Sequence, residues 1–338
     1  MNTKISVSVI VPVFNTELYL GKCLQSLVDQ TINNDIEIII IDDGSTDGSL
    51  QIAKYFSNKF KNIQVFTKKN EGQGLARNFG IQKAIGEYIC YVDSDDWVES
   101  TLCEDMVKIL DETNVDFVNF GADFFTPNGS IVKKIKCFTQ NELSGEIIFD
   151  YALIDKEILS ISWNKIYRRS FLLTNKILFP SIRVNEDLFY SRAVAYYAFK
   201  TSFVSKIYYH ALVRAGSTSR KMSIDMFQIS VDLINYEKLN FSERLKNKTT
   251  QIYFNAHIIK FLSYMLIQSA FRISKYSEFI LCFDVVEVIN YKKLCKSKLD
   301  LSPLNTKGKI TAILCRYPVL LRLMANILKK LGFSSFIY

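Results

Sequence analysis

The sequence has no paired-cysteine pattern. Its seven cysteines are odd in number, scattered over 338 residues and never spaced as C-x-x-C, which argues against a disulfide framework and against a zinc site. No apolar run reaches the roughly 18 residues that a membrane-spanning helix needs. The first residues also lack the apolar segment and small-residue cleavage site of a signal peptide. We therefore expect a cytoplasmic protein.

The net charge is close to zero over most of the chain and is concentrated near its end. Hydrophobic residues make up 49% and charged residues 22%, which excludes a disordered chain and leaves room for one large domain plus an appendage. The net charge is +8, and residues 291–338 alone contribute +9, with ten Lys or Arg against Asp300. The preceding body is therefore about neutral, and we expect no nucleic-acid partner.

Short apolar runs in the first third of the chain alternate with helical periodicity. This order predicts an α/β fold with parallel strands, and the strand-like runs are 7–13, 37–41, 63–67 and 88–92. Ligands of such sheets bind beyond the carboxyl ends of the strands. We therefore expect one cleft to collect the polar residues that follow these runs, namely Asn15, Asp42, Asp43, Arg77 and residues 93–96.

Three carboxylates within four positions follow the run Tyr88–Val92, at Asp93, Asp95 and Asp96. Acids this close repel one another unless a positive charge lies between them, and oxygen ligands suit a hard cation such as Mg²⁺ or Mn²⁺. A metal-bound diphosphate is the ligand that this pattern favours. The alternative is that the acids only cap a helix beginning near Val98.

In the second half of the chain the sequence pattern becomes mainly helical in period. Asn185 can cap a helix whose first turn holds Glu186 and Asp187, a position that the helix dipole favours for acids whether or not they are catalytic. From residue 225 the sequence is helical in period, over 225–239, 248–275, 278–294 and 307–331. We predict a catalytic domain over residues 1–224 and a helical region over residues 225–338.

Six motifs, in this order, resemble those of the inverting glycosyltransferase family 2. They are Val-Ser-Val-Ile-Val-Pro-Val-Phe-Asn (7–15), Asp-Asp-Gly-Ser-Thr-Asp (42–47), Asn-x-Gly-x-x-x-Ala-Arg-Asn-x-Gly (70–80), Asp-Ser-Asp-Asp-Trp (93–97), Trp-Asn-Lys-x-Tyr-Arg (163–168) and Asn-Glu-Asp (185–187). The resemblance covers roughly residues 5–220. It implies a GT-A fold, a Rossmann-like sheet with helices on both faces, followed by a mainly α-helical C-terminal region.

The resemblance also implies roles for single residues. Those that would bind the nucleotide sugar are Pro12, Phe14, Asn15, Asp43, Arg77, Asp93, Ser94, Arg214 and Ser217. Among them Asp43 would accept from a uracil ring nitrogen, Asp93 would reach the ribose, and Arg77 would approach the base or the diphosphate. Asp95 or Asp96 would hold Mn²⁺ or Mg²⁺. Asp187 would be the catalytic base, with Glu186 beside it.

The implied activity is metal-dependent transfer of a sugar from a nucleotide donor, with a UDP-sugar favoured. The acceptor would be a saccharide or a lipid-linked saccharide of a bacterial capsule, exopolysaccharide or O-antigen. A single base without a covalent intermediate implies inversion, so an α-linked donor would yield a β-glycosidic bond. The alternatives are a sugar-nucleotide pyrophosphorylase, disfavoured because no Gly-rich loop follows the first strand, and a non-catalytic assembly protein.

The basic tail suggests a further partner. A helix beginning at Pro318 would carry Arg322, Lys329 and Lys330 on one face and leucines, isoleucine and methionine on the other. Such a segment can lie on an anionic membrane or pack on the protein's own core, and periodicity alone leaves both open. The charge of residues 291–338 leads us to expect peripheral, salt-sensitive attachment to the inner face of the cell membrane.

Overall fold

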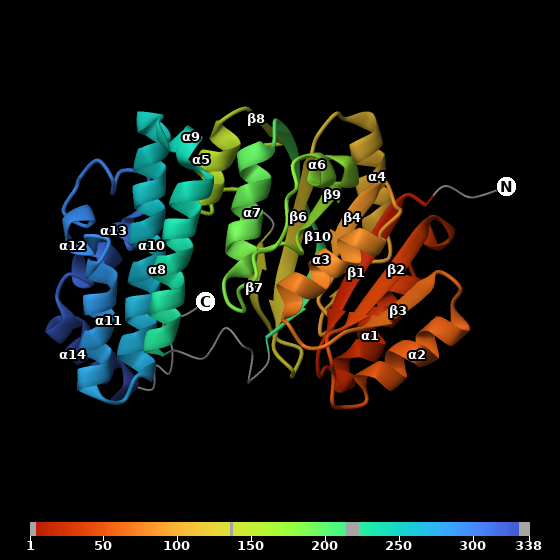
Figure 1. Ribbon diagram of the computed structural model, residues 1–338, viewed down its shortest axis with the longest axis horizontal. Coiled ribbons are helices and arrows are strands. Elements are labelled where there is room, and N and C mark those ends of the chain that lie inside the picture. Colours follow the sequence, from red (N-terminus) through yellow and green to blue (C-terminus); the bar gives the residue numbers. More distant parts are fainter. Residues whose placement is uncertain (1–4, 136–137, 214–222, 331–338) are drawn as a thin grey trace. The chain divides into compact units, whose positions relative to one another are not determined.

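The computed structural model describes residues 5–135, 138–213 and 223–330 (Figure 1). Contacts divide the chain into two compact units. The first comprises Met1–Ile148 and Glu157–Ala215, and the second comprises Phe149–Lys156 and Gly216–Tyr338. The change of unit thus comes a few residues before the predicted boundary at residue 225, and a short earlier segment joins the second unit.

The first unit is built on one mixed sheet in the order β3-β2-β1-β4-β9-β6-β10-β5, with β7 beside β6 and β8 beside β10 (Figure 1). The strands are β1 (Val7–Val13), β2 (Ile36–Asp42), β3 (Ile63–Thr67), β4 (Tyr88–Tyr91), β5 (Trp97–Val98), β6 (Phe117–Phe125), β7 (Ile131–Ile135), β8 (Glu142–Ser144), β9 (Lys165–Arg168) and β10 (Lys200–Leu212). The first four are parallel, whereas β9 runs antiparallel to both β4 and β6. The predicted α/β class is confirmed.

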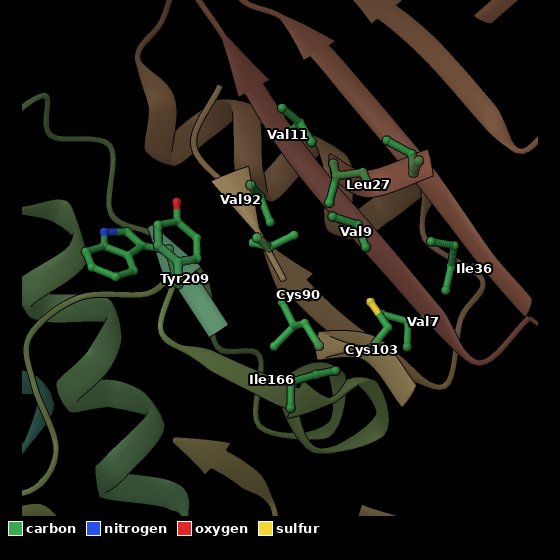
Figure 2. Close-up of a cluster of buried hydrophobic side chains, with 14 of the residues drawn as sticks. Val7, Val9, Val11, Leu27, Ile36, Cys90, Val92, Cys103, Ile166 and Tyr209 are labelled. Atoms are coloured by element: carbon green, nitrogen blue, oxygen red, sulfur yellow. The ribbon is translucent and has the colours of Figure 1, made fainter. Parts of the chain in front are cut away.

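Helices cover both faces of this sheet. They are α1 (Glu17–Val28), α2 (Ser49–Lys59), α3 (Gln73–Lys83), α4 (Leu102–Glu112), α6 (Arg169–Thr174) and α7 (Glu186–Tyr197), with a 3₁₀ turn η1 (Asn33–Asp35). Val7, Val9 and Val11 alternate along β1 and share one core with Leu27 of α1 (Figure 2). On the opposite face α3 lies so close that a Cβ on Gly80 would be 2.4 Å from Cγ2 of Ile10.

The start predicted for the helix near Val98 is wrong. Trp97 and Val98 instead form β5, which pairs with β10, where Tyr209 lies opposite Val98. The helix α4 begins only at Leu102, with Thr101 as its N-cap residue. The carboxylates that precede β5 therefore do not cap this helix.

The second unit is helical, as predicted. Its helices are α8 (Ile224–Asn240), α9 (Ser242–Leu245), α10 (Lys248–Arg272), α11 (Tyr276–Glu287), α12 (Tyr291–Leu294), α13 (Thr306–Leu314) and α14 (Pro318–Lys330), and α5 (Ile147–Leu153) lies where the chain first enters it. The long helix α10 contacts α9 and each of α11 to α14. The helical stretch predicted over 307–331 consists of two helices bent by 113°, and the second, α14, begins at Pro318 as predicted.

Among the described residues no single helix is both long and apolar enough to cross a membrane, whereas the bent pair α13 and α14 meets that test only when taken together. Periodicity alone did not predict which side of α14 faces the protein. Leu321 and Ala325 are its buried residues, and the Arg322 guanidinium also bonds inward. Its Nη1 donates to the Ala270 carbonyl at 2.6 Å and its Nη2 to the Ser274 carbonyl at 2.8 Å, at the end of α10.

Candidate active site

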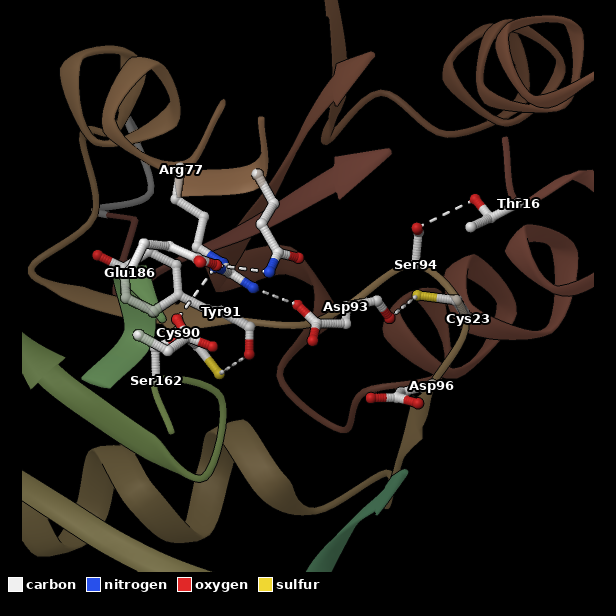
Figure 3. Close-up of polar contacts among 12 residues, drawn as sticks. Thr16, Cys23, Arg77, Cys90, Tyr91, Asp93, Ser94, Asp96, Ser162 and Glu186 are labelled. Carbon is white, nitrogen blue, oxygen red and sulfur yellow. Dashed lines mark hydrogen bonds and ion pairs between the residues drawn. The ribbon is translucent and has the colours of Figure 1, made fainter. Parts of the chain in front are cut away.

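A buried arginine connects the ends of three elements. Arg77, one turn into α3, has no exposed side-chain surface. Its Nη2 lies 2.6 Å from Oδ1 of Asp93, just after β4, and its Nη1 lies 3.1 Å from Oδ1 of Asp187 and 3.6 Å from Oε1 of Glu186 at the start of α7 (Figure 3). Four predicted site residues are thereby brought into direct contact.

The cluster holds three carboxylates against one guanidinium. Burial alone would lower the pKa of Arg77, but the charges of Asp187, Asp93 and Glu186 raise it, so this side chain stays cationic. Burial raises the pKa of Glu186 to about 7, with a further contribution from Asp187, although Arg77 opposes the shift. Burial also raises the pKa of Asp187. The cluster is therefore able to hold or release a proton near neutral pH.

The two adjacent acids of α7 have different surroundings. Asp187 accepts hydrogen bonds from Arg77 and from the Ser162 hydroxyl at 2.9 Å, and both are made to Oδ1. Among the described residues Oδ2 accepts none and can receive another donor. Its side chain is 21% exposed, against 4% for Glu186. Glu186 instead accepts from Nε2 of Gln73 at 2.5 Å, within the interface of α3 and α7. Asp187 is thus the more accessible acid.

The backbone at the start of α7 is shaped to present these acids. Asn185 has φ 64°, a left-handed conformation that asparagine adopts more readily than most residues, and its side chain does not cap the helix. Opposite it, a Cβ on Gly74 would lie 3.0 Å from Cγ of Glu186 and 3.1 Å from Cβ of Phe179. A glycine at position 74 therefore permits the close approach of α3 to α7.

The Asp93–Asp96 turn is held by β10. The Tyr209 hydroxyl accepts from the Asp93 amide at 3.0 Å and donates to Oδ2 of Asp96 at 2.7 Å, while the Leu212 amide donates to Oδ1 of Asp96 at 2.7 Å. Burial, followed by the charges of Asp95 and Asp93, raises the pKa of Asp96 well above its ordinary value. Both oxygens of Asp96 are thus used to fix the turn.

The chemistry of the donor set favours Asp95 for contact with a cation. Its side chain is partly exposed, whereas Asp96 is buried and Asp93 is paired with Arg77. In the described part of the chain no three His, Cys, Asp or Glu side chains are grouped so as to hold a metal by themselves. Mg²⁺ is commonly bound by one or two carboxylates together with substrate phosphates. The residues present fit a cation that is shared with a diphosphate.

Asp43, predicted to bind the base, is already engaged. Its Oδ1 accepts from Nζ of Lys68 at 2.9 Å and from the Glu71 amide at 3.0 Å, and its Oδ2 accepts from the Gly72 amide at 2.7 Å. Gly72 has φ 100°, which a side chain would strain. Asp43 therefore fixes the loop that leads into α3.

Of the remaining predicted residues, Pro12, Phe14 and Asn15 lie at the end of β1, and Ser94 follows β4. Pro12 is buried in the strand, and Phe14 is 47% exposed just after it. Asn15 accepts from the Thr46 amide at 2.8 Å, and Ser94 accepts from the Thr16 hydroxyl at 3.0 Å, which joins the ends of β1 and β4 (Figure 3). Arg214 and Ser217 lie outside the described residues.

Three contact residues of this site were not predicted. Ser162 and Gln73 orient Asp187 and Glu186, and Tyr209 orients the Asp93–Asp96 turn. No local pattern distinguishes Ser162 or Gln73. Tyr209 had a weak signal, since a tyrosine in a buried strand usually finds a partner for its hydroxyl.

The chain is similar to proteins of known family. The family model described as glycosyl transferase family 2 matches residues 8–174. The chain is 35% identical over 232 residues to EpsH of Bacillus subtilis, a provisionally named glycosyltransferase, covering 68% of this chain and 67% of EpsH. It is 34% identical over 260 residues to the cholesterol galactosyltransferase of Borreliella burgdorferi, covering 74% and 72%.

A solved structure supports the fold. The solved structure is that of residues 1–349 of Staphylococcus aureus TarS in complex with UDP-GlcNAc, and TarS is a poly(ribitol-phosphate) β-N-acetylglucosaminyltransferase. It superposes on this chain with a TM-score of 0.71 and 24% sequence identity. The superposition covers 97% of this chain and 92% of the TarS chain. The predicted GT-A fold is confirmed. The family match, the relatives and the shared fold together establish that the chain belongs to glycosyltransferase family 2.

Proposed function

We propose that this glycosyltransferase moves a sugar from a UDP-sugar to a saccharide or lipid-linked saccharide, with inversion and formation of a β-glycosidic bond. The observation that carries the proposal is the Arg77 cluster, which holds Asp187 beside the Asp93–Asp96 turn at the carboxyl ends of the parallel strands. A base and a leaving-group site are thereby neighbours.

Asp187 serves as the base. Its Oδ2 takes the proton of the acceptor hydroxyl while the acceptor oxygen bonds to the anomeric carbon and the bond from that carbon to the diphosphate oxygen breaks. Ser162 and Arg77 fix the carboxylate through Oδ1, and its raised pKa makes it a better proton acceptor than an ordinary aspartate. Glu186, buried against Gln73, has a positioning role.

Asp95 holds Mn²⁺ or Mg²⁺ together with the donor diphosphate. When bound, the cation supplies positive charge to the departing UDP. Asp96, Tyr209 and Leu212 keep the turn in place, and Arg77 holds Asp93 toward the donor instead of contacting the diphosphate itself. Phe14 is exposed beside the turn-forming Asn15 and is suited to contact the nucleotide base.

The relatives support a UDP-sugar as the donor. TarS was crystallised with UDP-GlcNAc, its name gives a polymer acceptor, and the Borreliella enzyme is named for a sterol acceptor. We place the reaction in surface polysaccharide synthesis, of a capsule or O-antigen, in the cytoplasm at the inner face of the cell membrane. Arg214 and Ser217 are proposed to close over the diphosphate.

Donor hydrolysis tests the proposal without knowledge of the acceptor. UDP-glucose, UDP-galactose, their N-acetyl forms and GDP-mannose are incubated with the full chain and Mn²⁺, and released nucleotide is quantified. We expect release from one of the UDP-sugars, dependent on Mn²⁺ and absent in Asp95→Ala. Preferential release from GDP-mannose would contradict the UDP assignment, and full activity in excess EDTA would contradict the role of the metal.

A further inference from the structure

The outward side of α14 is aliphatic. Four of its side chains, Val319, Leu320, Leu323 and Ile327, are 68%, 42%, 55% and 50% exposed. Their spacing puts them on one side of the helix, and we call this set the outer face of α14. The inward side contacts the rest of the unit through Leu321 and Ala325, with Arg322 bonded to the end of α10.

An ordinary surface helix exposes mainly polar residues, whereas α14 exposes these four aliphatic side chains in addition to Asn326, Lys329 and Lys330. Arg322, in the middle of α14, donates to the carbonyl of Ala270 in α10 and to that of Ser274 just after it, while large aliphatic side chains stay uncovered in the described chain. The adjoining α13 adds two further exposed aliphatic residues, Ile310 (54%) and Ile313 (45%). Single exposed apolar residues are common, but several on consecutive turns indicate an interaction surface.

Basic side chains accompany this surface. Lys307 and Lys309 of α13 and Lys329 and Lys330 of α14 are exposed. Asp300 is the one acidic residue in the sequence from 291 to 338, against ten Lys or Arg. Two copies of the chain meeting through this surface would bring like charges together, which disfavours a second copy as the partner.

We infer that the outer face of α14, together with α13, docks on an anionic lipid bilayer. The aliphatic side chains enter the boundary between headgroups and acyl chains, and the lysines meet the lipid charge. The helices lie on the membrane, because neither is long enough to cross it and the bend between them is 113°. The inference extends the proposed location and does not depend on the proposed reaction.

The test is co-sedimentation of the full chain with vesicles of phosphatidylcholine alone or with phosphatidylglycerol, at low and high salt. We expect binding only to the anionic vesicles, weakened by salt. The double variant Leu323→Glu/Ile327→Glu should weaken binding about tenfold or more. Leu239→Glu on α8 is the matched control, since Leu239 is 75% exposed and outside this surface, and it should bind as the wild type does.

A second variant covers the case in which the double glutamate variant does not fold. Lys329→Gln/Lys330→Gln leaves the aliphatic residues intact and should weaken binding and its salt dependence. Absence of wild-type binding, or equal binding by all variants, would overturn the inference. So would a wild-type dimer that becomes monomeric in Leu323→Glu/Ile327→Glu, which would identify a second copy as the partner. Donor hydrolysis, measured in parallel, separates these outcomes from failure of the proposed reaction.

Discussion

Two neighbouring carboxylates at the start of α7 differ in exposure and in hydrogen bonding, and this difference predicts different kinetic roles. Asp187→Asn keeps the shape of the side chain and removes its basicity, so we expect transfer to fall by about 10²-fold or more while UDP affinity is retained. Glu186→Gln should lower transfer less than Asp187→Asn does. The measurements are kcat and KM for transfer and calorimetric UDP binding. Normal transfer by Asp187→Asn with loss in Glu186→Gln would move the base one residue back.

The raised pKa of Glu186 ties the stability of the fold to pH. The unfolded carboxyl loses its proton near 4.5, whereas the folded one retains it up to about 7. Because the folded state binds more protons in this window, the free energy of unfolding falls as the pH rises through it. Glu186→Gln keeps an oxygen for Gln73 and cannot ionise, so it should raise the free energy of unfolding above pH 7 by on the order of 2 kcal/mol.

Urea unfolding at about pH 5 and about pH 8 measures this effect. The gain from Glu186→Gln should be larger at the higher pH. Glu112→Gln, a change at an exposed position on α4, is the control and should not alter the free energy of unfolding at either pH. Identical pH dependence in wild type and Glu186→Gln would show that burial of this carboxyl does not govern stability.

At the scale of elements, the position of α3 depends on its glycines. A Cβ at Gly80 would lie 2.4 Å from Cγ2 of Ile10, so Gly80→Ala forces α3 away from β1. We expect a loss of about 1–3 kcal/mol in the free energy of unfolding, and reduced activity because α3 carries Arg77. Gly21→Ala on α1 is the matched control. Nothing lies within 4 Å of the Cβ that Gly21→Ala adds, so this variant should leave the free energy of unfolding unchanged or raise it slightly. Equal stability of both variants would contradict the close packing.

The predictable elements are those whose signals are local. Apolar runs that end in polar residues predicted β1 to β4 and the edge of the sheet at which the candidate site lies. The start of the helix near Val98 was predicted wrongly because a two-residue apolar stretch is compatible with a helix or a strand. Trp97 and Val98 form a strand because they pair with the distant β10. Periodicity separated the apolar and basic sides of α14 but did not show which side faces inward, because the carbonyls that accept from Arg322 lie at the end of α10 and just after it.

The site was predicted in part for the same reason. Its acids follow recognisable strands and motifs, whereas the contact between Arg77 and Asp187 joins residues far apart in sequence. Ser162 orients Asp187 from an irregular segment that has no periodicity. These contacts arise from the tertiary structure, and no spacing in the sequence encodes them.

For the whole molecule, a ligand that binds only the folded chain should raise its stability. UDP with Mn²⁺ at a hundredfold excess over its Kd would add about 2.7 kcal/mol by mass action. Thermal unfolding is the measurement, with UDP in EDTA as the control that lacks metal. Asp95→Ala should show no added stability when UDP and Mn²⁺ are present, compared with the same variant without ligand. Equal stabilisation by UDP in EDTA would exclude a metal bridge between Asp95 and the diphosphate.

The six described cysteines are buried and unpaired, three in the first unit (Cys23, Cys90 and Cys103) and three in the second (Cys282, Cys295 and Cys315). Burial raises the pKa of each of these thiols, so little reactive thiolate is present at these six positions of the folded chain. Alkylation of these thiols therefore requires local opening. Mass spectrometry of maleimide-treated protein would give separate opening rates for the two units, and nucleotide with Mn²⁺ should slow the modification of Cys23, whose thiol donates to the Asp93 carbonyl.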